Sequence, residues 1–325
     1  MSSEPSAGRP SAIVMAAFSA VVVLGGANAV AVKQTVGELT PFWGAALRFV
    51  AAGAVMLLLV VVTRRKIPTG KSLRGAVVYG LLGFSASYGF LYTGIQEVPA
   101  GTLMVLVALT PLFTFGLAIL HRQESFRIQG LIGAVIAVVG IGIVFMDQVD
   151  AAVPIGSMLL VMLGTVAIAE SGVVAKGIPK SDPLGTNAVA MLAGGLVLFV
   201  LAVGTQEPLD LPTTTITWLA TVYLVLFGSV AMFGLYLFTL QRWTASAVSY
   251  VTLLMPLVTV ALAAILFDER VSPTFALGSV VILTGVYVGA FLTTRPQKTA
   301  ETLPECLPVG AEDMATTGRP SPKPG

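Results

Sequence analysis

The sequence predicts an all-α integral membrane protein with ten transmembrane helices, arranged as two inverted five-helix repeats. Three observations lead to this prediction. The chain of 325 residues is 56% hydrophobic and only 10% charged, whereas soluble domains carry charge on about a quarter of their residues. Long apolar runs recur along the chain, and Lys and Arg gather in alternate connections between them. This composition excludes a soluble enzyme, a nucleic-acid-binding protein and a disordered chain.

Ten runs are long and apolar enough to cross a membrane, which takes about 20 mostly apolar residues per helix. Pro, Gly or charged residues mark nearly every boundary, and the connections are too short to hold a soluble domain. A transmembrane β-barrel would alternate polar and apolar residues, but stretches such as 51–62 are continuously apolar. The predicted spans lie at about 11–32, 41–63, 74–93, 98–120, 128–146, 155–175, 184–203, 216–240, 245–267 and 272–293.

The placement of Lys and Arg predicts that both termini are cytoplasmic. With the N-terminus inside, the cytoplasmic connections are basic. They contain Arg64, Arg65, Lys66, Lys71, Arg74, Arg122, Arg127, Lys176, Lys180 and Arg242. The opposite connections hold only two basic residues, Lys33 and Arg270, together with a set of acids. Because the bias alternates through all ten spans, it supports both the orientation and the number of spans.

The two ends of the chain differ from the rest in composition. Residues 1–10 and 295–325 are predicted to be disordered tails, because they are rich in Pro, Gly and polar residues. The first span has an alternative interpretation, since Arg9, an apolar run and Ala27-Asn28-Ala29 resemble a signal peptide. The run is long for a signal peptide, however, and its cleavage would leave nine spans and break the repeat described next.

An internal repeat relates the two halves of the chain. A shift of about 145 residues aligns the halves without a gap from residue 98 to residue 145. Matches of Pro, Gly and Glu between membrane helices rarely arise by chance, so we interpret the alignment as a true repeat of units 11–146 and 155–293. The aligned pairs include Pro111 and Pro256, Glu124 and Glu269, Gly133 and Gly278, Gly140 and Gly285, and Gly83 and Gly228.

The number of spans in each unit predicts how the units are related. Five is odd, so the second unit begins on the opposite side of the membrane and the repeat is inverted. Inverted repeats are typical of secondary transporters, whose substrate site lies near the midplane between the halves. Channels also carry inverted repeats, so a channel or facilitator that does not alternate is the competing functional interpretation.

Two segments, 91–120 and 235–292, resemble a known family. In and just after each segment, a small residue starts the span, a proline lies mid-span, an acid lies just beyond the span and glycines space the next span. These residues are Ala100, Pro111, Glu124, Gly133 and Gly140 in the first half and Ala245, Pro256, Glu269, Gly278 and Gly285 in the second. In this order, the features resemble the two halves of EamA-type members of the drug/metabolite transporter superfamily. The resemblance covers about residues 11–293. It departs from the family pattern at His121-Arg122-Gln123-Glu124, where a glycine commonly precedes the acid.

The resemblance implies a ten-helix carrier that moves amino acids, other small metabolites or drugs, often outward across the bacterial inner membrane. Carriers of phosphorylated sugars and nucleotide sugars belong to the same superfamily, so these substrates are an alternative. We expect a small-molecule substrate, protons as candidate coupling ions, contact with membrane lipid and no nucleic-acid partner. The protein is expected to be a monomer or a homodimer.

Two charged residues, Arg48 and Glu170, lie well inside predicted spans, where ionisable side chains are costly and often functional. The guanidinium of Arg48 is suited to hold a substrate carboxylate or phosphate, or it is structural and ties helix ends together. Glu170 is a candidate coupling carboxylate that binds and releases protons. It is equally suited to hold a substrate ammonium, or to reach the cytoplasmic side or a neighbouring helix. The sequence does not decide whether the two side chains meet.

Several uncharged polar residues also lie inside spans, where most such side chains bond to a neighbouring helix. The candidates for a substrate cavity are Asn28, Tyr88, Tyr236 and Tyr250. Aromatic residues near span ends are predicted to be interfacial anchors. They are Tyr79, Tyr92, Trp43, Trp218 and Trp243.

Mid-span prolines and paired glycines predict local helix geometry. Pro111 and Pro256 free a carbonyl and kink their helices, and we hypothesise that these kinks bend during transport rather than only shape the packing. Several glycines are predicted to let helices approach closely. They are Gly25-Gly26, Gly194-Gly195, Gly133, Gly140 and Gly142.

The sequence gives little support to an enzyme. Its one histidine, His121, lies at a predicted cytoplasmic helix end, which argues against His-based metal sites and Ser-His catalysis. Its one cysteine, Cys306, excludes an intramolecular disulfide. No complete Gly-x-x-x-x-Gly-Lys-Ser/Thr phosphate-binding loop is present, because Arg65 stands where the motif before Gly70-Lys71-Ser72 requires its first glycine, so we expect no intrinsic ATPase. We expect no cofactor and no bound metal.

Overall fold

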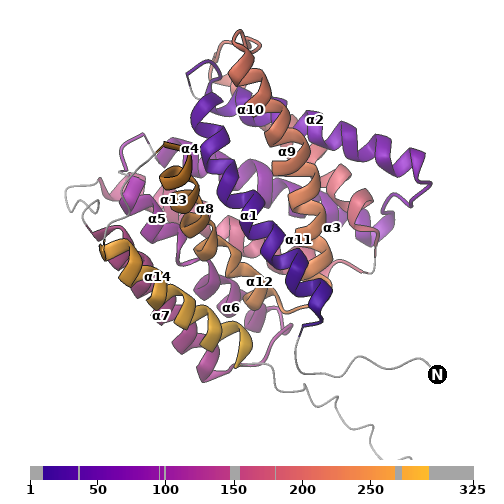
Figure 1. Ribbon diagram of the computed structural model, residues 1–325. Coiled ribbons are helices and arrows are strands. Elements are labelled where there is room, and N and C mark those ends of the chain that lie inside the picture. Colours follow the sequence, from indigo (N-terminus) through magenta and orange to yellow (C-terminus); the bar gives the residue numbers. More distant parts are fainter. Residues whose placement is uncertain are drawn as a thin grey trace, which may run out of the picture.

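The computed structural model describes residues 10–35, 37–94, 96–98, 100–146, 154–179, 181–267 and 273–292, and every regular element within these ranges is a helix (Figure 1). The first half forms α1 (Ala12–Thr35), α2 (Pro41–Val62), α3 (Gly70–Gly80), η1 (Leu81–Ala86), α4 (Ser87–Gly94), α5 (Ala100–Val107), α6 (Thr110–Leu120) and α7 (Ile128–Val144). The second half forms α8 (Ile155–Gly177), α9 (Pro183–Gly204), α10 (Thr215–Val225), η3 (Leu226–Ala231), α11 (Met232–Leu240), α12 (Ala245–Ser249), α13 (Val251–Phe267), α14 (Pro273–Val286) and η4 (Tyr287–Phe291).

The described helices have the length and composition of membrane spans. Nine helical segments in the described ranges have at least 18 residues and are apolar enough to cross a membrane. The predicted fifth span corresponds to α7, which is apolar but has 17 residues, at the lower limit of the roughly 17–25 residues that suffice. The prediction of an all-helical, multi-pass membrane protein is thus confirmed. Both predicted disordered tails, except Pro10, lie outside the described residues.

Local sequence explains where several helices begin. Prolines open α2 and α9, where the missing N–H would have had no partner in the first turn. The side chain of Asp182 accepts hydrogen bonds from the backbone N–H groups of Leu184 and Gly185 at the start of α9. Thr214 and Thr244 cap α10 and α12 in the same way. The Pro and polar residues that mark the predicted boundaries therefore act as helix starts.

Two π-helical segments interrupt long helices at related positions. η1 separates α3 from α4, and η3 separates α10 from α11. The segments begin at Leu81 and Leu226, which the shift of about 145 residues aligns. Because π-helical hydrogen bonds reach one residue further than α-helical ones, such segments displace carbonyl groups from the regular ladder.

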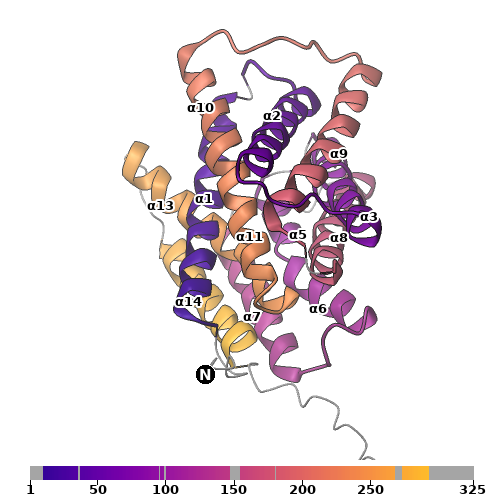
Figure 2. The ribbon, with the colours of Figure 1, turned by 90° about the vertical axis from the view of Figure 1, so that its right-hand side faces the viewer.

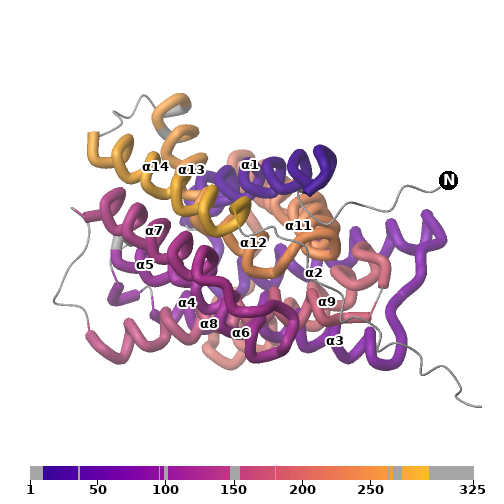
Figure 3. The backbone as a smooth tube through the Cα atoms, turned by 90° about the horizontal axis from the view of Figure 1, so that it is seen from below, coloured from indigo at the N-terminus to yellow at the C-terminus, as the bar shows by residue number. Residues whose placement is uncertain are grey.

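Close glycine contacts hold several helix pairs together. α7 and α14 lie side by side (Figures 1 and 3). A Cβ on Gly140 would lie 2.7 Å from the backbone nitrogen of Ile282, and one on Gly278 would lie 2.8 Å from the carbonyl oxygen of Gly140. Gly194 approaches the carbonyl of Gly80 in the same manner. These positions tolerate no side chain, as the prediction of close helix approach requires. The prediction is wrong for Gly142, because a Cβ there would meet no atom within 4 Å.

The helix contacts follow a pattern that involves both halves. α2 packs along α9, α1 packs against α10, α11 and α13, and α8 packs against α4 and α6. Helices far apart in sequence are therefore interleaved, so the two halves share one bundle. The outward faces of the bundle are apolar: the side chains of Leu58, Leu120 and Ile265 are 62%, 74% and 77% exposed.

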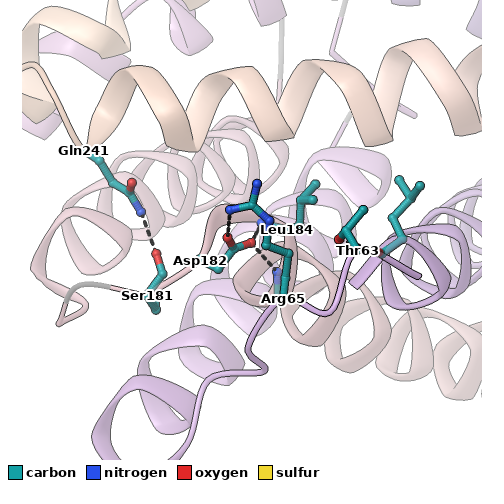
Figure 4. Close-up of polar contacts among 8 residues, drawn as sticks. Thr63, Arg65, Ser181, Asp182, Leu184 and Gln241 are labelled. Carbon is teal, nitrogen blue, oxygen red and sulfur yellow. Dashed lines mark hydrogen bonds and ion pairs between the residues drawn. The ribbon is translucent and has the colours of Figure 1, made fainter. Parts of the chain in front are cut away.

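The connections between helices gather at two ends of the bundle. At one end, Arg65 forms an ion pair of 3.3 Å with Asp182, and Gln241 donates a hydrogen bond of 3.1 Å to the carbonyl of Ser181 (Figure 4). At the other end, the long connection from α9 to α10 crosses the top of the bundle in Figure 2. There Glu207 accepts a hydrogen bond of 2.8 Å from the backbone of Trp43. Connections predicted to share a side of the membrane contact one another.

Candidate functional site

A central cavity of about 350 Å³ lies where the two halves meet. Its lining comes from α1, α2, α3, η1, α4 and α6 of the first half and from α8, α11, α12 and α13 of the second. Arg48 is the one charged residue among the described residues that line it. The site is thus a mostly apolar chamber with a single fixed positive charge.

Arg48 is held against the π-helical segment η3. Its side chain projects from α2, and the residue is 6% exposed. Nε donates a hydrogen bond of 2.8 Å to Oγ of Ser229, and Nη2 donates one of 2.8 Å to the carbonyl of Gly228. Cζ lies 5.1 Å from the ring centre of Phe49. These groups orient the guanidinium, but they carry no negative charge.

Asn28 of α1 joins the same carbonyl. Its Nδ2 donates hydrogen bonds of 3.2 Å to the carbonyl of Gly228 and 3.4 Å to Sδ of Met232, while its buried Oδ1 has no hydrogen-bond partner. A Cβ on Gly228 would lie 2.0 Å from that Oδ1, so only glycine fits. We call Asn28, Arg48, Gly228 and Ser229 the anchor cluster, since hydrogen bonds connect them into one group, in which Asn28 and Arg48 line the cavity.

Aromatic rings form much of the remaining wall. Tyr79, Phe84, Tyr88, Phe233 and Tyr236 all line the cavity. The rings of Phe84 and Phe233 meet edge to face with centroids 4.9 Å apart, a favourable aromatic geometry. The structure places the predicted candidates Tyr88 and Tyr236 here. The prediction of Tyr79 as an interfacial anchor is wrong, because this residue is only 2% exposed and faces the cavity.

Glu170 lies outside the cavity lining. Its Oε1 is 3.0 Å from Nε2 of His121, and its Oε2 is buried without a hydrogen-bond partner. This pair joins α8 to the end of α6. Two neighbours add to the contact: Gln123 donates to the carbonyl of Val173, and Glu124 accepts hydrogen bonds from Ser246 at the start of α12. The structure therefore separates Glu170 from Arg48 and places it in a polar junction of three helices.

Tyr250 also lies outside the cavity lining. The residue is 3% exposed, and its hydroxyl donates a hydrogen bond of 3.5 Å to the carbonyl of Gly130. A Cβ on Gly289 would overlap this hydroxyl, so Tyr250 is wedged between α7 and η4. Trp243 is likewise buried, packed between Phe18 and Phe291, which corrects its prediction as an interfacial residue.

The two mid-span prolines have different surroundings. Pro111 lies at the start of α6, just after the break that separates α5 from α6, and Oγ1 of Thr110 donates a hydrogen bond of 2.6 Å to the carbonyl of Val107. That carbonyl is the one which Pro111 leaves without its helical N–H partner. Pro256 lies inside the continuous helix α13. Both helices contribute residues to the cavity.

Sequence reasoning missed some residues that the structure brings to the site. Phe84 and Phe233 line the cavity, and His121 is the partner of Glu170. The aligned pair Gly83 and Gly228 was a usable signal, because both glycines lie in π-helical segments, Gly83 in the cavity lining and Gly228 in contact with Arg48. The pattern alone did not predict that the carbonyl of Gly228 would accept hydrogen bonds from Arg48 and Asn28.

Comparison with known proteins agrees with this architecture. The family model for the EamA-like transporter family matches residues 11–146 and 155–290. The uncharacterized inner membrane transporter YedA of Escherichia coli K12 is 27% identical over 268 residues, which cover 82% of this chain and 87% of YedA. A probable amino-acid metabolite efflux pump of Escherichia coli K12 is 26% identical over 282 residues, which cover 83% of this chain and 92% of that protein.

A solved crystal structure has a similar fold. It superposes with a TM-score of 0.73 at 19% sequence identity and covers 86% of this chain and 96% of that chain. At this identity the similarity concerns the arrangement of helices alone.

Proposed function

The chain belongs to the EamA-like transporter family, and we propose that it is a secondary transporter that exports small metabolites by alternating access. Members of this family, and the relatives compared above, are membrane transporters rather than enzymes. We infer amino acids or drug-like compounds as the exported metabolites and the bacterial inner membrane as the location. The similarity to a probable amino-acid metabolite efflux pump supports amino acids as the first compounds to test.

The central cavity is the observation that carries this proposal. Helices of both halves line it, so a movement of one half against the other would change its access to the two sides. A site between two related halves is the arrangement found in secondary transporters. A cavity of about 350 Å³ is within the usual size range of small-ligand pockets.

Three features support ten crossings in two inverted repeats. η1 and η3 lie at aligned positions of the two halves. The shift of about 145 residues aligns α1 with α8, α4 with α11 and α6 with α13. The contacts of α1 with α11 and α13 match those of α8 with α4 and α6. The connections also segregate to two ends according to the predicted crossings. The distribution of Lys and Arg favours cytoplasmic termini.

Proton coupling through Glu170 is part of the proposal. Glu170 and His121 join α8 and α6, two helices that also line the cavity. A change of charge on either side chain would alter the contact between these helices, and hence the access to the cavity from that end. A channel remains the alternative function to be tested.

The test is counterflow in proteoliposomes. A thermal-shift screen of the purified protein against metabolites first identifies a ligand, because ligands that bind the folded state raise its stability. Liposomes are then preloaded with that unlabelled ligand, and entry of the labelled ligand is measured. We expect saturable entry that the internal ligand accelerates. Entry that rises linearly with concentration and ignores the internal ligand would contradict alternating access and indicate a channel.

A further inference from the structure

The charge of the cavity indicates which compounds it accepts. The described lining contains one cation, Arg48, and no anion. The two contacts between acidic and basic side chains found within the described residues join Arg65 to Asp182 and His121 to Glu170, so neither involves Arg48. An arginine keeps its proton in proteins, and a buried charge without a counter-ion is costly. The cavity is therefore complementary to an anion.

The geometry of Arg48 indicates the shape of that anion. Nε and one N–H of Nη2 are occupied by Ser229 and Gly228. The N–H groups of Nη1 and the second N–H of Nη2 make no hydrogen bond within the described part of the chain. Nη1 and Nη2 form the end-on edge of the guanidinium, which matches the two oxygens of a carboxylate. Because the other edge is fixed, this end-on edge is already oriented before a ligand arrives.

The rest of the wall limits the ligand further. A phosphate dianion would require a second cation, and the described lining supplies none. An amine without an acid group would meet the charge of Arg48 with no carboxylate on the described wall to offset it. Phe84, Tyr88 and Phe233 instead provide an apolar surface, which suits a hydrocarbon or aromatic body.

We propose that the carried compounds are small monocarboxylates with an apolar body, and that Arg48 holds their carboxylate through Nη1 and Nη2. The apolar body lies against the aromatic wall. This inference rests on the proposed transport function and narrows its substrates. It also assigns Ser229 and the carbonyl of Gly228 as positioning groups, which act on the ligand through Arg48.

Three compounds with one carbon skeleton test the substrate class on the unmodified protein. Leucine carries a carboxylate and an ammonium, 4-methylpentanoate carries only the carboxylate, and 3-methylbutylamine carries only the ammonium. We expect millimolar leucine and 4-methylpentanoate to raise the melting temperature, and 3-methylbutylamine and inorganic phosphate to leave it unchanged. No shift with either carboxylate, or an equal shift with the amine, would overturn the inference. This comparison requires no variant and is unaffected by misfolding.

The role of Arg48 is tested with matched charge removals. Arg48→Gln should weaken binding of 4-methylpentanoate by about 10- to 100-fold, as expected for loss of a hydrogen bond to a charged group. Arg65→Gln removes the same charge at an exposed ion pair and should bind as the wild type does. Ser229→Ala should give a smaller loss. Wild-type affinity in a folded Arg48→Gln protein would overturn the inference.

These experiments can refute the transport proposal and the carboxylate-binding proposal independently of each other. Accelerated counterflow together with wild-type binding by Arg48→Gln would leave the transporter proposal intact and refute the carboxylate anchor. Binding that depends on Arg48 without accelerated counterflow would support the anchor and refute alternating access.

Discussion

The π-helical segments η1 and η3 have the same backbone form but different chemical surroundings. η1 and η3 each have six residues with glycine in the third position. In η1 the carbonyl of Gly83 accepts a hydrogen bond from Ser87 of the same span. In η3 the carbonyl of Gly228 accepts hydrogen bonds from Arg48 and Asn28, which come from two other helices. The repeat therefore duplicates the shape of the chain without duplicating the anchor cluster.

The sequence explains why only one copy has this cluster. A shift of about 145 residues brings Arg48 onto Ala193 and Asn28 onto Val173. Neither residue can donate a side-chain hydrogen bond to η1. Two related backbones are enough for two halves to exchange roles, whereas one positive charge is enough to hold one acid group. Under the proposed function, the backbone form that η1 and η3 share serves movement, and the anchor cluster at η3 serves recognition.

The largest expected difference is between two variants that each add one methyl group, Gly83→Ala in η1 and Gly228→Ala in η3. In Gly228→Ala the new Cβ would lie 2.0 Å from Oδ1 of Asn28, whereas in Gly83→Ala the nearest atom, Oγ of Ser171, would be 3.1 Å away. Displacing Asn28 and Arg48 should reduce ligand affinity by about 10-fold or more. Gly83→Ala should stay within about twofold of the wild type. Equal losses in the two variants, measured by ligand titration, would contradict the asymmetry.

A smaller effect is expected from the two prolines. The break before Pro111 is also supported by the hydrogen bond from Thr110 to Val107, whereas Pro256 lies inside an otherwise continuous helix. Pro256→Ala should therefore slow counterflow several-fold, and Pro111→Ala should slow it less. Ligand affinity should be preserved in both, because neither proline belongs to the anchor cluster. Full counterflow rates in both variants would refute the bending hypothesis.

Glu170 provides a test of coupling away from the anchor cluster. Glu170→Gln keeps the size of the side chain that contacts His121 but removes its charge. If Glu170 couples transport to protons, counterflow in this variant should lose its dependence on pH, because a glutamine side chain does not bind and release protons. Glu124→Gln is the matched control, since Glu124 lies at the same junction and contacts Ser246. Unchanged pH dependence in Glu170→Gln would exclude it as the coupling site.

The smallest effect is expected at the opposite end of the bundle. Hydrogen bonds from Thr214, Thr213 and Thr217 lower the pKa of Glu38 from 4.5 to about 2. A lowered pKa means that the ionised form stabilises the folded state above about pH 4.5, and that this contribution is lost as the pH falls towards 2. Glu38→Gln should lower the melting temperature slightly at neutral pH and show less acid destabilisation. A larger acid loss in the variant than in the wild type would contradict this assignment.

Sequence reasoning predicted how deep a side chain lies in the membrane better than it predicted which way the side chain points from its helix. Four of the residues predicted for the cavity do line it: Asn28, Arg48, Tyr88 and Tyr236. The helices and their boundary residues could also be predicted, because each depends on a short stretch of chain. Tyr250 was chosen on the same grounds, yet it faces α7. Which face of an all-apolar helix points inward depends on contacts with distant segments, and uniformly apolar spans give no periodicity to reveal it.

Pairs of distant residues were also beyond sequence reasoning. Glu170 meets His121 rather than Arg48, and the partners of Arg48 are a hydroxyl and a carbonyl nearly two hundred residues away. The carbonyl of Gly228, which accepts these hydrogen bonds, lies in the π-helical segment η3, and the sequence did not predict that segment. The chemistry of the anchor cluster therefore became visible only with the structure.

Accessibility of the central cavity from each side of the membrane tests the account most directly. The chain has one cysteine, so Cys306→Ser gives a cysteine-free background for Ser87→Cys, a position that lines the cavity. A membrane-impermeant maleimide is applied to one side of the membrane at a time. We predict reaction from both sides, with a bound carboxylate ligand accelerating one and slowing the other. Reaction from one side only, or equal reaction from both sides regardless of ligand, would contradict a cavity that alternates.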